Sequence, residues 1–332
     1  MKKVSIQDIA DKLGVSKGTV SLVLSGKAKI GRVSMETSRK VRKMAAEMNY
    51  YPNEIARSLT TGITMTIGVI VTDISNEFFG NLTFNIQERA KKYGYSVITT
   101  NTNESLEEFN NAVTVLMNKQ ADGIILVPVD GGEKTVKRII DRRIPMVQID
   151  RFYQEIDASY VIVENLKSSF DAIELLIRKG HKRIGLICYD LNVSALINRK
   201  LGYTEALKQN GLLDTNLIKN INYENQEEEI KLAISELKND PIGVDAIYFC
   251  SRRVFITGVK YMHIENIKIP NEMEVICFDK IDSFSITGFP ISYIEQPIKQ
   301  MGELAVDILL KQLNGDFEPN KIELPSKITM IN

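Results

Sequence analysis

The first 60 residues carry the groups best suited to binding a polyanion. They hold twelve lysines and arginines and five acidic residues, a net charge of +7, whereas the rest of the chain holds 30 basic and 37 acidic residues. A basic segment on an acidic remainder favours a nucleic-acid partner for that segment alone. On charge alone, a solvated lysine-rich face is the alternative.

Catalytic or metal chemistry is not indicated. The sequence has no GxxxxGK[ST], GxSxG or HExxH motif, and His181 and His263 are its only histidines. The three cysteines, Cys188, Cys250 and Cys277, have no metal-site spacing and are interpreted as buried reduced thiols. We expect no enzyme activity, no catalytic residue, no cofactor and no metal, although the many aspartates leave a hydrolytic carboxylate pair open as an alternative.

No segment predicts export or membrane insertion. The N-terminal residues lack the apolar stretch of a signal peptide, and no run reaches the roughly 18 apolar residues of a membrane span. We expect a soluble, cytoplasmic protein, since reduced thiols also fit a reducing compartment. A solute-binding protein for uptake is the rival interpretation, but it would need a signal peptide and would have no use for residues 1–60.

Residues 1–48 predict three short helices. Ser5, Ser16 and Ser34 each precede a helical apolar pattern and are expected N-caps, and Gly14 and Gly26 are expected to end the first two helices. Three capped helices in so short a segment predict a small all-α domain, called the head below.

Residues 49–62 predict a hinge helix or linker. Pro52 and Gly62 bound a segment of about eight helix-forming residues. So short a helix is marginal in water and should depend on packing or a partner.

From residue 63 to 332, apolar runs alternate with amphipathic stretches, which is typical of parallel, doubly wound α/β sheets. Two series of strands predict two lobes, with the ligand at the strand ends facing the cleft. The first series is Thr66–Val71, Ser96–Thr100, Gly123–Val127 and Pro145–Ile149; the second lies near 160–163, 183–188, 245–250 and 273–278. We expect an N-lobe of about 63–160 plus 293–322, and a C-lobe of about 161–292 plus 323–332.

Motifs along the whole chain resemble the lactose-repressor (LacI/GalR) family of bacterial regulators. The matching stretches are 4–10, 14–21, 32–34, 51–53 and 56–59 in the head, and 67–70, 73–79, 122–125, 180–184, 202–203 and 278–279 in the body. The resemblance implies an all-α helix-turn-helix head plus an α/β periplasmic-binding-protein-like body of two doubly wound parallel-sheet lobes. It also implies a sequence-specific transcriptional regulator, most simply a repressor, controlled by a sugar or sugar derivative. The head would bind a near-palindromic operator as a homodimer, and no apolar heptads indicate a tetramer.

The second helix of the head is expected to enter the major groove. Lys17 can donate to guanine, and Thr19 and Ser21 can contact phosphate or base edges. Leu22 stands where relatives often carry arginine, so it makes either an apolar base contact or a packing contact. The connector resembles the hinge helix of the family, in which a leucine that matches Leu59 wedges into the minor groove of the DNA. The expected DNA-binding residues are Ser5, Ser16, Lys17, Gly18, Thr19, Ser21, Leu22, Arg32, Ser34, Asn53, Ala56, Arg57 and Leu59.

The resemblance also places effector-binding residues in the cleft. Carboxylates and a guanidinium at strand ends suit a polyol, and two phenylalanines would form an apolar wall. The expected residues are Phe78, Phe79, Asp150, Arg151, Arg199, Arg252 and Asp279. The alternative is that Asp150 and Arg151 form an inter-lobe ion pair and that the phenylalanines are helix core.

Ser251-Arg252 departs from the family's usual Asn-Asp. With Arg199 opposite, Arg252 could complete a two-guanidinium clamp, which gives the hypothesis of an anionic effector such as a sugar phosphate or sugar acid. Pairing of Arg252 with an acid across the cleft is the alternative.

Overall fold

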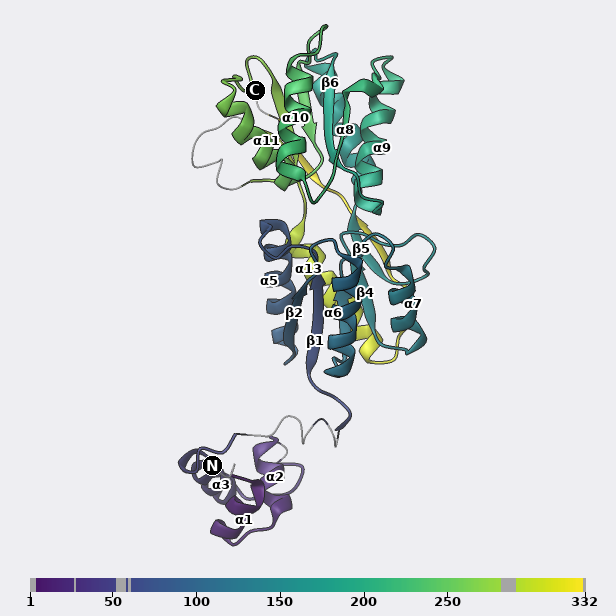
Figure 1. The fold of residues 1–332 in the computed structure, drawn as a ribbon. Helices are drawn as coiled ribbons and strands as arrows, with labels where there is room; N and C mark the ends of the chain where they lie inside the picture. Colours follow the sequence, from purple (N-terminus) through teal and green to yellow (C-terminus); the bar gives the residue numbers. More distant parts are fainter. Residues whose placement is uncertain (1–3, 27, 52–57, 59–60, 282–290, 331–332) are drawn as a thin grey trace. The chain divides into compact units, whose positions relative to one another are not determined.

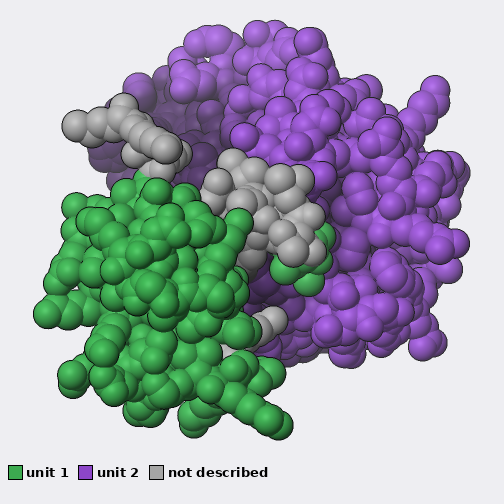
Figure 2. Space-filling view, turned by 90° about the horizontal axis from the view of Figure 1, so that it is seen from below, with its two compact units in different colours: residues 1–64 green, residues 65–332 purple. Residues whose placement is uncertain are grey.

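A computed structural model describes residues 4–26, 28–51, 58, 61–281 and 291–330 of the 332-residue chain. The chain divides into two compact units, residues 1–64 and 65–332, which are coloured separately in Figure 2. Four expected DNA-binding residues of the hinge, Asn53, Ala56, Arg57 and Leu59, lie outside the described residues.

The first unit contains the three predicted helices, α1 (Ile6–Leu13), α2 (Lys17–Leu24) and α3 (Met35–Glu47). Each expected serine cap is confirmed: the side chains of Ser5, Ser16 and Ser34 accept from backbone N–H groups in the first turns of their helices. Gly14 ends α1 with φ +64°, a left-handed conformation that favours glycine. The helices bury one small core, formed by Ile9, Ala10, Val20, Val23, Val41 and Ala45.

The second unit contains a six-stranded sheet of order β11-β5-β4-β3-β1-β2, in which all neighbours are parallel. Its strands β1, β2, β4 and β5 are labelled in Figure 1. The strands are β1 (Thr66–Val71), β2 (Ser96–Asn101), β3 (Gly123–Leu126), β4 (Met146–Ile149), β5 (Tyr160–Val163) and β11 (Lys321–Leu324). The helices of this lobe are α5 (Glu77–Lys92), α6 (Leu106–Asn118), α7 (Glu133–Asp141) and α13 (Ile298–Leu313). Ile67 and Val69 of β1 join one core cluster with α5 and α13, and Ile70 joins another with α6 and α7. Both faces of the sheet are therefore covered, as the near-continuous apolar strand predicts.

The other sheet has the order β12-β10-β9-β8-β6-β7, parallel except for the β10–β12 pair. Its strands are β6 (Ile184–Tyr189), β7 (Ile218–Ile221), β8 (Ala246–Phe249), β9 (Glu274–Phe278), β10 (Ser292–Glu295) and β12 (Lys327–Thr329). Its helices are α8 (Asn165–Arg178), α9 (Ser194–Gln209), α10 (Gln226–Lys238) and α11 (Arg252–Ile264), with a short 3-10 turn at Thr215–Leu217. The two sheets confirm the predicted fold class of a two-lobed α/β body.

Two strands lie on the other side of the expected lobe boundaries. β5 pairs with β4 in the first sheet, although residues from 161 were expected in the C-lobe. β10 pairs with β9 in the second sheet, although residues from 293 were expected in the N-lobe. An apolar run predicts a strand, but its neighbour in the sheet depends on where the chain crosses between lobes. The crossings follow β5, β10 and β11 in the described chain.

The Gly202-Tyr203 pair fixes the contact between α8 and α9. A Cβ atom at Gly202 would lie 2.3 Å from the carbonyl oxygen of Leu166 and 2.9 Å from the backbone nitrogen of Phe170. The fully buried Tyr203 donates its hydroxyl to the carbonyl of Ile184 at 2.6 Å. The close approach of the helices therefore requires glycine, and the tyrosine joins α9 to β6.

His181 has a structural role, because its imidazole pairs with two carboxylates at the starts of neighbouring strands. Its Nε2 atom lies 2.8 Å from Glu274 and its Nδ1 atom 3.4 Å from Asp245. The imidazole thus joins the starts of β6, β8 and β9, at the end of the sheet opposite to the strand ends that face the other lobe. Of the helices that the structure describes, none is both long and apolar enough to cross a membrane.

Candidate functional site

The predicted recognition helix presents a polar N-terminal end. Ser16, Lys17, Gly18 and Ser21 are exposed, and Thr19 is half-buried. The backbone N–H of Thr19 donates to Ser16 Oγ at 3.0 Å, which fixes the first turn of α2. The N-terminus of a helix, together with the exposed Lys17 side chain, suits contact with phosphate and base edges.

The other expected head residues divide into exposed groups and one packing residue. Ser5, Arg32 and Ser34 are exposed, and the two serines cap α1 and α3. Leu22 is half-buried, and it packs so closely on the following loop that a Cβ at Gly31 would lie 2.4 Å from its Cδ1 atom. The structure therefore gives Leu22 the packing contact that the sequence left open as an alternative.

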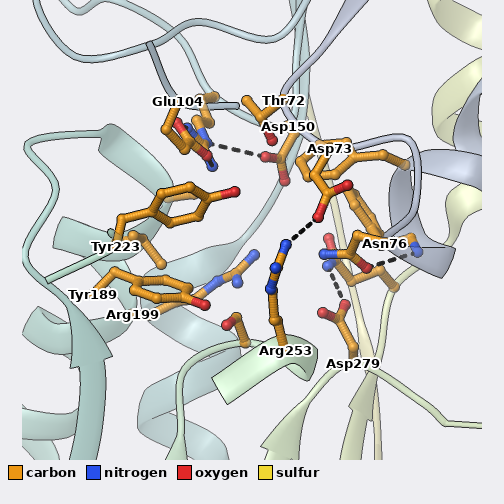
Figure 3. Close-up of a pocket in the computed structure, with 17 residues that line it drawn as sticks. Thr72, Asp73, Asn76, Glu104, Asp150, Tyr189, Arg199, Tyr223, Arg253 and Asp279 are labelled. Carbon is orange, nitrogen blue, oxygen red and sulfur yellow. Dashed lines mark hydrogen bonds and ion pairs between the residues drawn. The ribbon is translucent and has the colours of Figure 1, made fainter. Parts of the chain in front are cut away.

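A pocket in the second unit lies between the two lobes and is shown in Figure 3. It contains about 560 Å³ of empty space, part of which is open solvent. Six of the seven expected effector residues line it: Phe78, Phe79, Asp150, Arg151, Arg199 and Asp279. The acidic residues Asp73, Asp150 and Asp279 follow β1, β4 and β9, so they stand at the carboxyl ends of parallel strands, where α/β folds bind ligands.

Asp150 and Asp279 are held in unusual backbone conformations. Their φ angles are +69° and +124°, in the region that L-residues rarely adopt. Such a conformation costs on the order of 1–3 kcal/mol and persists where the surroundings enforce it. Both carboxylates are buried, and burial raises the pKa of each despite the lowering effect of nearby Arg199. Two strained, buried carboxylates facing one pocket are typical of a binding site.

Arg151 is held by two carboxylates and a backbone carbonyl. Its Nη1 and Nη2 atoms donate to Glu104 at 2.8 and 2.7 Å, and Nη1 also reaches the carbonyl of Pro128 at 3.2 Å. Its Nε lies 3.3 Å from Asp150. The ion pair of Asp150 and Arg151 thus exists, but it lies within the first lobe and does not join the lobes. Arg151 positions the Asp150 carboxylate.

Arg199 is fixed in place and yet directed at the pocket (Figure 3). Its Nε donates to Asn165 Oδ1 and its Nη1 to the carbonyl of Cys250, both at 2.8 Å. The guanidinium lies 3.6 Å from the ring centroid of Phe278. Nη2 has no hydrogen-bond partner among the described residues, so this nitrogen can donate to a ligand.

Aromatic rings stand on both lobes of the pocket. Phe78 and Phe79 pack edge to face at 5.0 Å and belong to the helix core as well as to the pocket wall, so both interpretations of them hold. From the second lobe come Tyr189 and Tyr223, with ring centroids 5.3 Å apart. Neither tyrosine was among the predicted effector-binding residues. Tyr189 directly follows the strand predicted near 183–188 and could have been found there, whereas Tyr223 follows β7, which was not predicted.

Comparison with known proteins decides which family this arrangement belongs to. Residues 5–53 match the family described as bacterial regulatory proteins, lacI family, and residues 173–330 match the periplasmic binding protein-like domain. The chain is 30% identical over 330 residues to the HTH-type transcriptional repressor PurR of Vibrio atlanticus, covering 98% of this chain and 96% of that one. The chain belongs to the lacI family of bacterial regulatory proteins.

Other relatives of this lacI-family regulator agree with that assignment. It is 29% identical over 317 residues to the ribose operon repressor of Haemophilus influenzae, covering 95% of this chain and 93% of that one. The crystal structure of the Lac repressor dimer bound to operator and the anti-inducer ONPF has the same fold, with a TM-score of 0.87 at 21% identity, covering 99% of this chain and 98% of that one. The chain is a DNA-binding transcriptional regulator and not an enzyme, which confirms the prediction from its sequence.

Arg252 of the regulator is not where the anionic-effector hypothesis required it. It does not line the pocket with Arg199; its Nη2 pairs instead with Glu77 of α5 in the first lobe. The next residue, Arg253, lines the pocket and pairs with Asp73. The expected clamp of Arg199 and Arg252 is therefore wrong. The reason is geometric, because neighbouring residues at the start of a helix point in directions about 100° apart.

Asp279 should make ligand binding by the regulator pH-dependent. Burial raises its pKa to about 6, and it accepts from Gln296 Nε2 at 2.6 Å and from the backbone of Arg252 at 3.4 Å. A carboxylate that accepts a ligand hydroxyl must be ionised, so affinity should be constant above pH 7 and fall up to about tenfold per unit below pH 6. Calorimetric titration between pH 5 and 8 measures this. The Asp279→Asn variant should lose both the pH dependence and most of the affinity. An affinity that rises on acidification would show that Asp279 donates rather than accepts.

Proposed function

We propose that this regulator is a repressor that binds a near-palindromic operator as a homodimer, and that a small effector in the inter-lobe pocket changes its affinity for DNA. Asp150, Arg199 and Asp279 carry this proposal because three buried, oriented polar groups converge on one pocket from both lobes. A ligand that touches both lobes can bias their relative position and so couple to DNA binding by about 1–3 kcal/mol. Since its partner is chromosomal DNA, we place the regulator in the cytoplasm.

The effector class is a neutral, hydroxyl-rich molecule, a sugar or a close derivative. Two of the arginines that line the pocket have carboxylate partners: Arg151 pairs with Glu104 and Asp150, and Arg253 pairs with Asp73. Arg199 offers one donor, and Asp279 offers acceptors. This set suits hydroxyl groups better than a phosphate, and flanking aromatic rings suit the apolar face of a sugar. Relatives named ribose operon repressors support the same class.

A two-stage screen tests the proposal. An operator is first selected from random duplexes with the full-length protein, and its affinity is then measured against salt and against a panel of sugars, sugar phosphates and sugar acids. A steep loss of affinity with salt is expected from phosphate contacts, and a neutral sugar should change operator affinity. A protein that selects no duplex, or that responds only to anionic ligands, would contradict the proposal.

The minor-groove role that the family resemblance gives to Leu59 predicts a variant that loses operator affinity but keeps its affinity for the sugar. Leu59→Ala should weaken binding to the selected operator by about tenfold or more, because the variant lacks a side chain that can wedge into the minor groove. Sugar binding should be unchanged, since the described residues that line the pocket all belong to the second unit. Electrophoretic mobility shift and calorimetry measure the two affinities. Leu201→Ala, the same change at an exposed position of α9, is the matched control and should alter neither.

A further inference from the structure

Two neighbouring arginines of the second lobe reach the first lobe. Arg252 and Arg253 are the first two residues of α11, which packs on β8 and β9. Arg252 Nη2 pairs with Glu77, the first residue of α5, and Arg253 Nη1 pairs with Asp73, which follows β1. Figure 3 shows the second of these pairs crossing the pocket.

One partner of each pair is held by further contacts within its own lobe, so Arg252 and Asp73 are oriented for their partners. Arg252 Nη1 donates to the carbonyl of Lys280 at 3.2 Å, and the Arg252 side chain is only 11% exposed. Asp73 Oδ1 accepts from the backbone and hydroxyl of Ser75 at 2.9 and 2.6 Å, which leaves Oδ2 for Arg253. Ion pairs with fixed partners lose less side-chain entropy than freely exposed ones.

The position of the two arginines in α11 also favours contact with acidic residues of the first lobe. They occupy the N-terminus of α11, where the helix dipole disfavours cations, and the first turn of α11 contains no acidic residue. Asp279 of the second lobe accepts from the backbone N–H of Arg252 at 3.4 Å, but the carboxylates that pair with the two guanidinium groups come from the first lobe. Separating the lobes would therefore leave both guanidinium groups without these ion-pair partners near the positive end of the helix.

We propose that the Arg252–Glu77 and Arg253–Asp73 pairs form a two-point latch that holds the two lobes together when no ligand is bound. The two arms differ in their relation to the pocket. Arg253 and Asp73 line it, whereas Arg252 and Glu77 do not. A ligand that contacts Asp73 or Arg253 thus competes with the inner arm and leaves the outer arm intact; this step alone rests on the proposed function.

Spin labels on the two lobes can test the latch without effector or DNA. Glu107→Cys on α6 and Leu201→Cys on α9 give exposed labelling positions, whereas the native Cys188, Cys250 and Cys277 are buried. Pulsed dipolar spectroscopy on the full-length protein, with labelled chains diluted in unlabelled chains so that a homodimer carries one labelled subunit, gives the distance distribution between the lobes. We expect one dominant population in the otherwise native protein.

The latch variant is the double change Arg252→Gln with Arg253→Gln. It should increase the population at longer distance about threefold or more, and high salt should have a similar effect on the native latch. The matched control is Lys260→Gln with Lys268→Gln, which removes the same charge from exposed positions of the same lobe and should leave the distribution unchanged.

A charge swap guards against loss of folding in the double variant. Glu77→Arg and Arg252→Glu should each broaden the distribution alone and restore it when combined. An unchanged distribution in folded Arg252→Gln/Arg253→Gln protein, or a swap that fails to restore it, would overturn the latch. Because no effector is used, either result is independent of whether a sugar binds.

Discussion

Replacing Arg199 with alanine should abolish the response to the effector while the protein still binds its operator. The side chain is held by Asn165, the carbonyl of Cys250 and the ring of Phe278, so its remaining donor is already aimed at the ligand. Removing a preorganised charged donor from a buried site costs several kcal/mol of binding, and we expect a loss of about 100-fold or more in affinity. Calorimetry with the sugar found in the screen measures it directly.

The loss should be specific to the guanidinium of Arg199. Lys200→Ala removes the same charge from the next position of α9, where the amine pairs with Asn220 outside the pocket, and should leave affinity within about twofold. Arg199→Lys keeps the charge but not the planar fork, so most of the affinity should still be lost. If the alanine variant binds the sugar as the native protein does, Arg199 has no part in the site.

Gly202→Ala should have the largest effect on stability of any single methyl group added to the body. The new Cβ would lie 2.3 Å from a backbone oxygen of α8, and backbone atoms cannot turn away as a flexible side chain can. We expect a loss of about 3 kcal/mol, or a fall in Tm of roughly 6–12 °C, because α8 and α9 must move apart. Thermal unfolding followed by circular dichroism checks this.

The same substitution elsewhere supplies the control. Gly80 lies within α5, and a Cβ there would meet its nearest atom, the carbonyl oxygen of Ile74, at an ordinary 3.5 Å. Gly80→Ala should therefore raise stability by about 0.5–1 kcal/mol through helix propensity. A Gly202→Ala protein that unfolds at the native temperature would show that α8 and α9 can separate without cost.

Local rules predicted local structure well. The three serine caps of the head and the glycine that ends α1 follow from side-chain chemistry within a few residues, and the structure confirms each. The strand–helix alternation likewise predicted a two-lobed α/β body. β7 was missed because its sequence, IKNI, is half polar and only its last residue is buried.

The predictions that were wrong depended on contacts between residues that lie far apart in the sequence. The apolar pattern of β5 and β10 is the same whichever sheet they join, so pairing with β4 and β9 could not be predicted from it. Prediction of the pocket residues was limited in the same way. Six effector residues were placed in the pocket by resemblance, but the choice between Arg252 and Arg253 depends on the exact start of α11. Helix boundaries are the least predictable feature of a helix.

The three crossings between the lobes have a consequence for synthesis on the ribosome. The head has its own core within the first 50 residues and can fold as soon as it emerges. Neither lobe of the body can be completed at that stage, because both sheets need strands that come after residue 290. The first sheet needs β11, and the second needs β10 and β12; helix α13 of the first lobe also comes after residue 290. A nascent or prematurely terminated chain therefore acquires its DNA-binding helices long before it acquires a pocket. Control by the effector is the last property that the growing chain gains and the first that a shortened one loses.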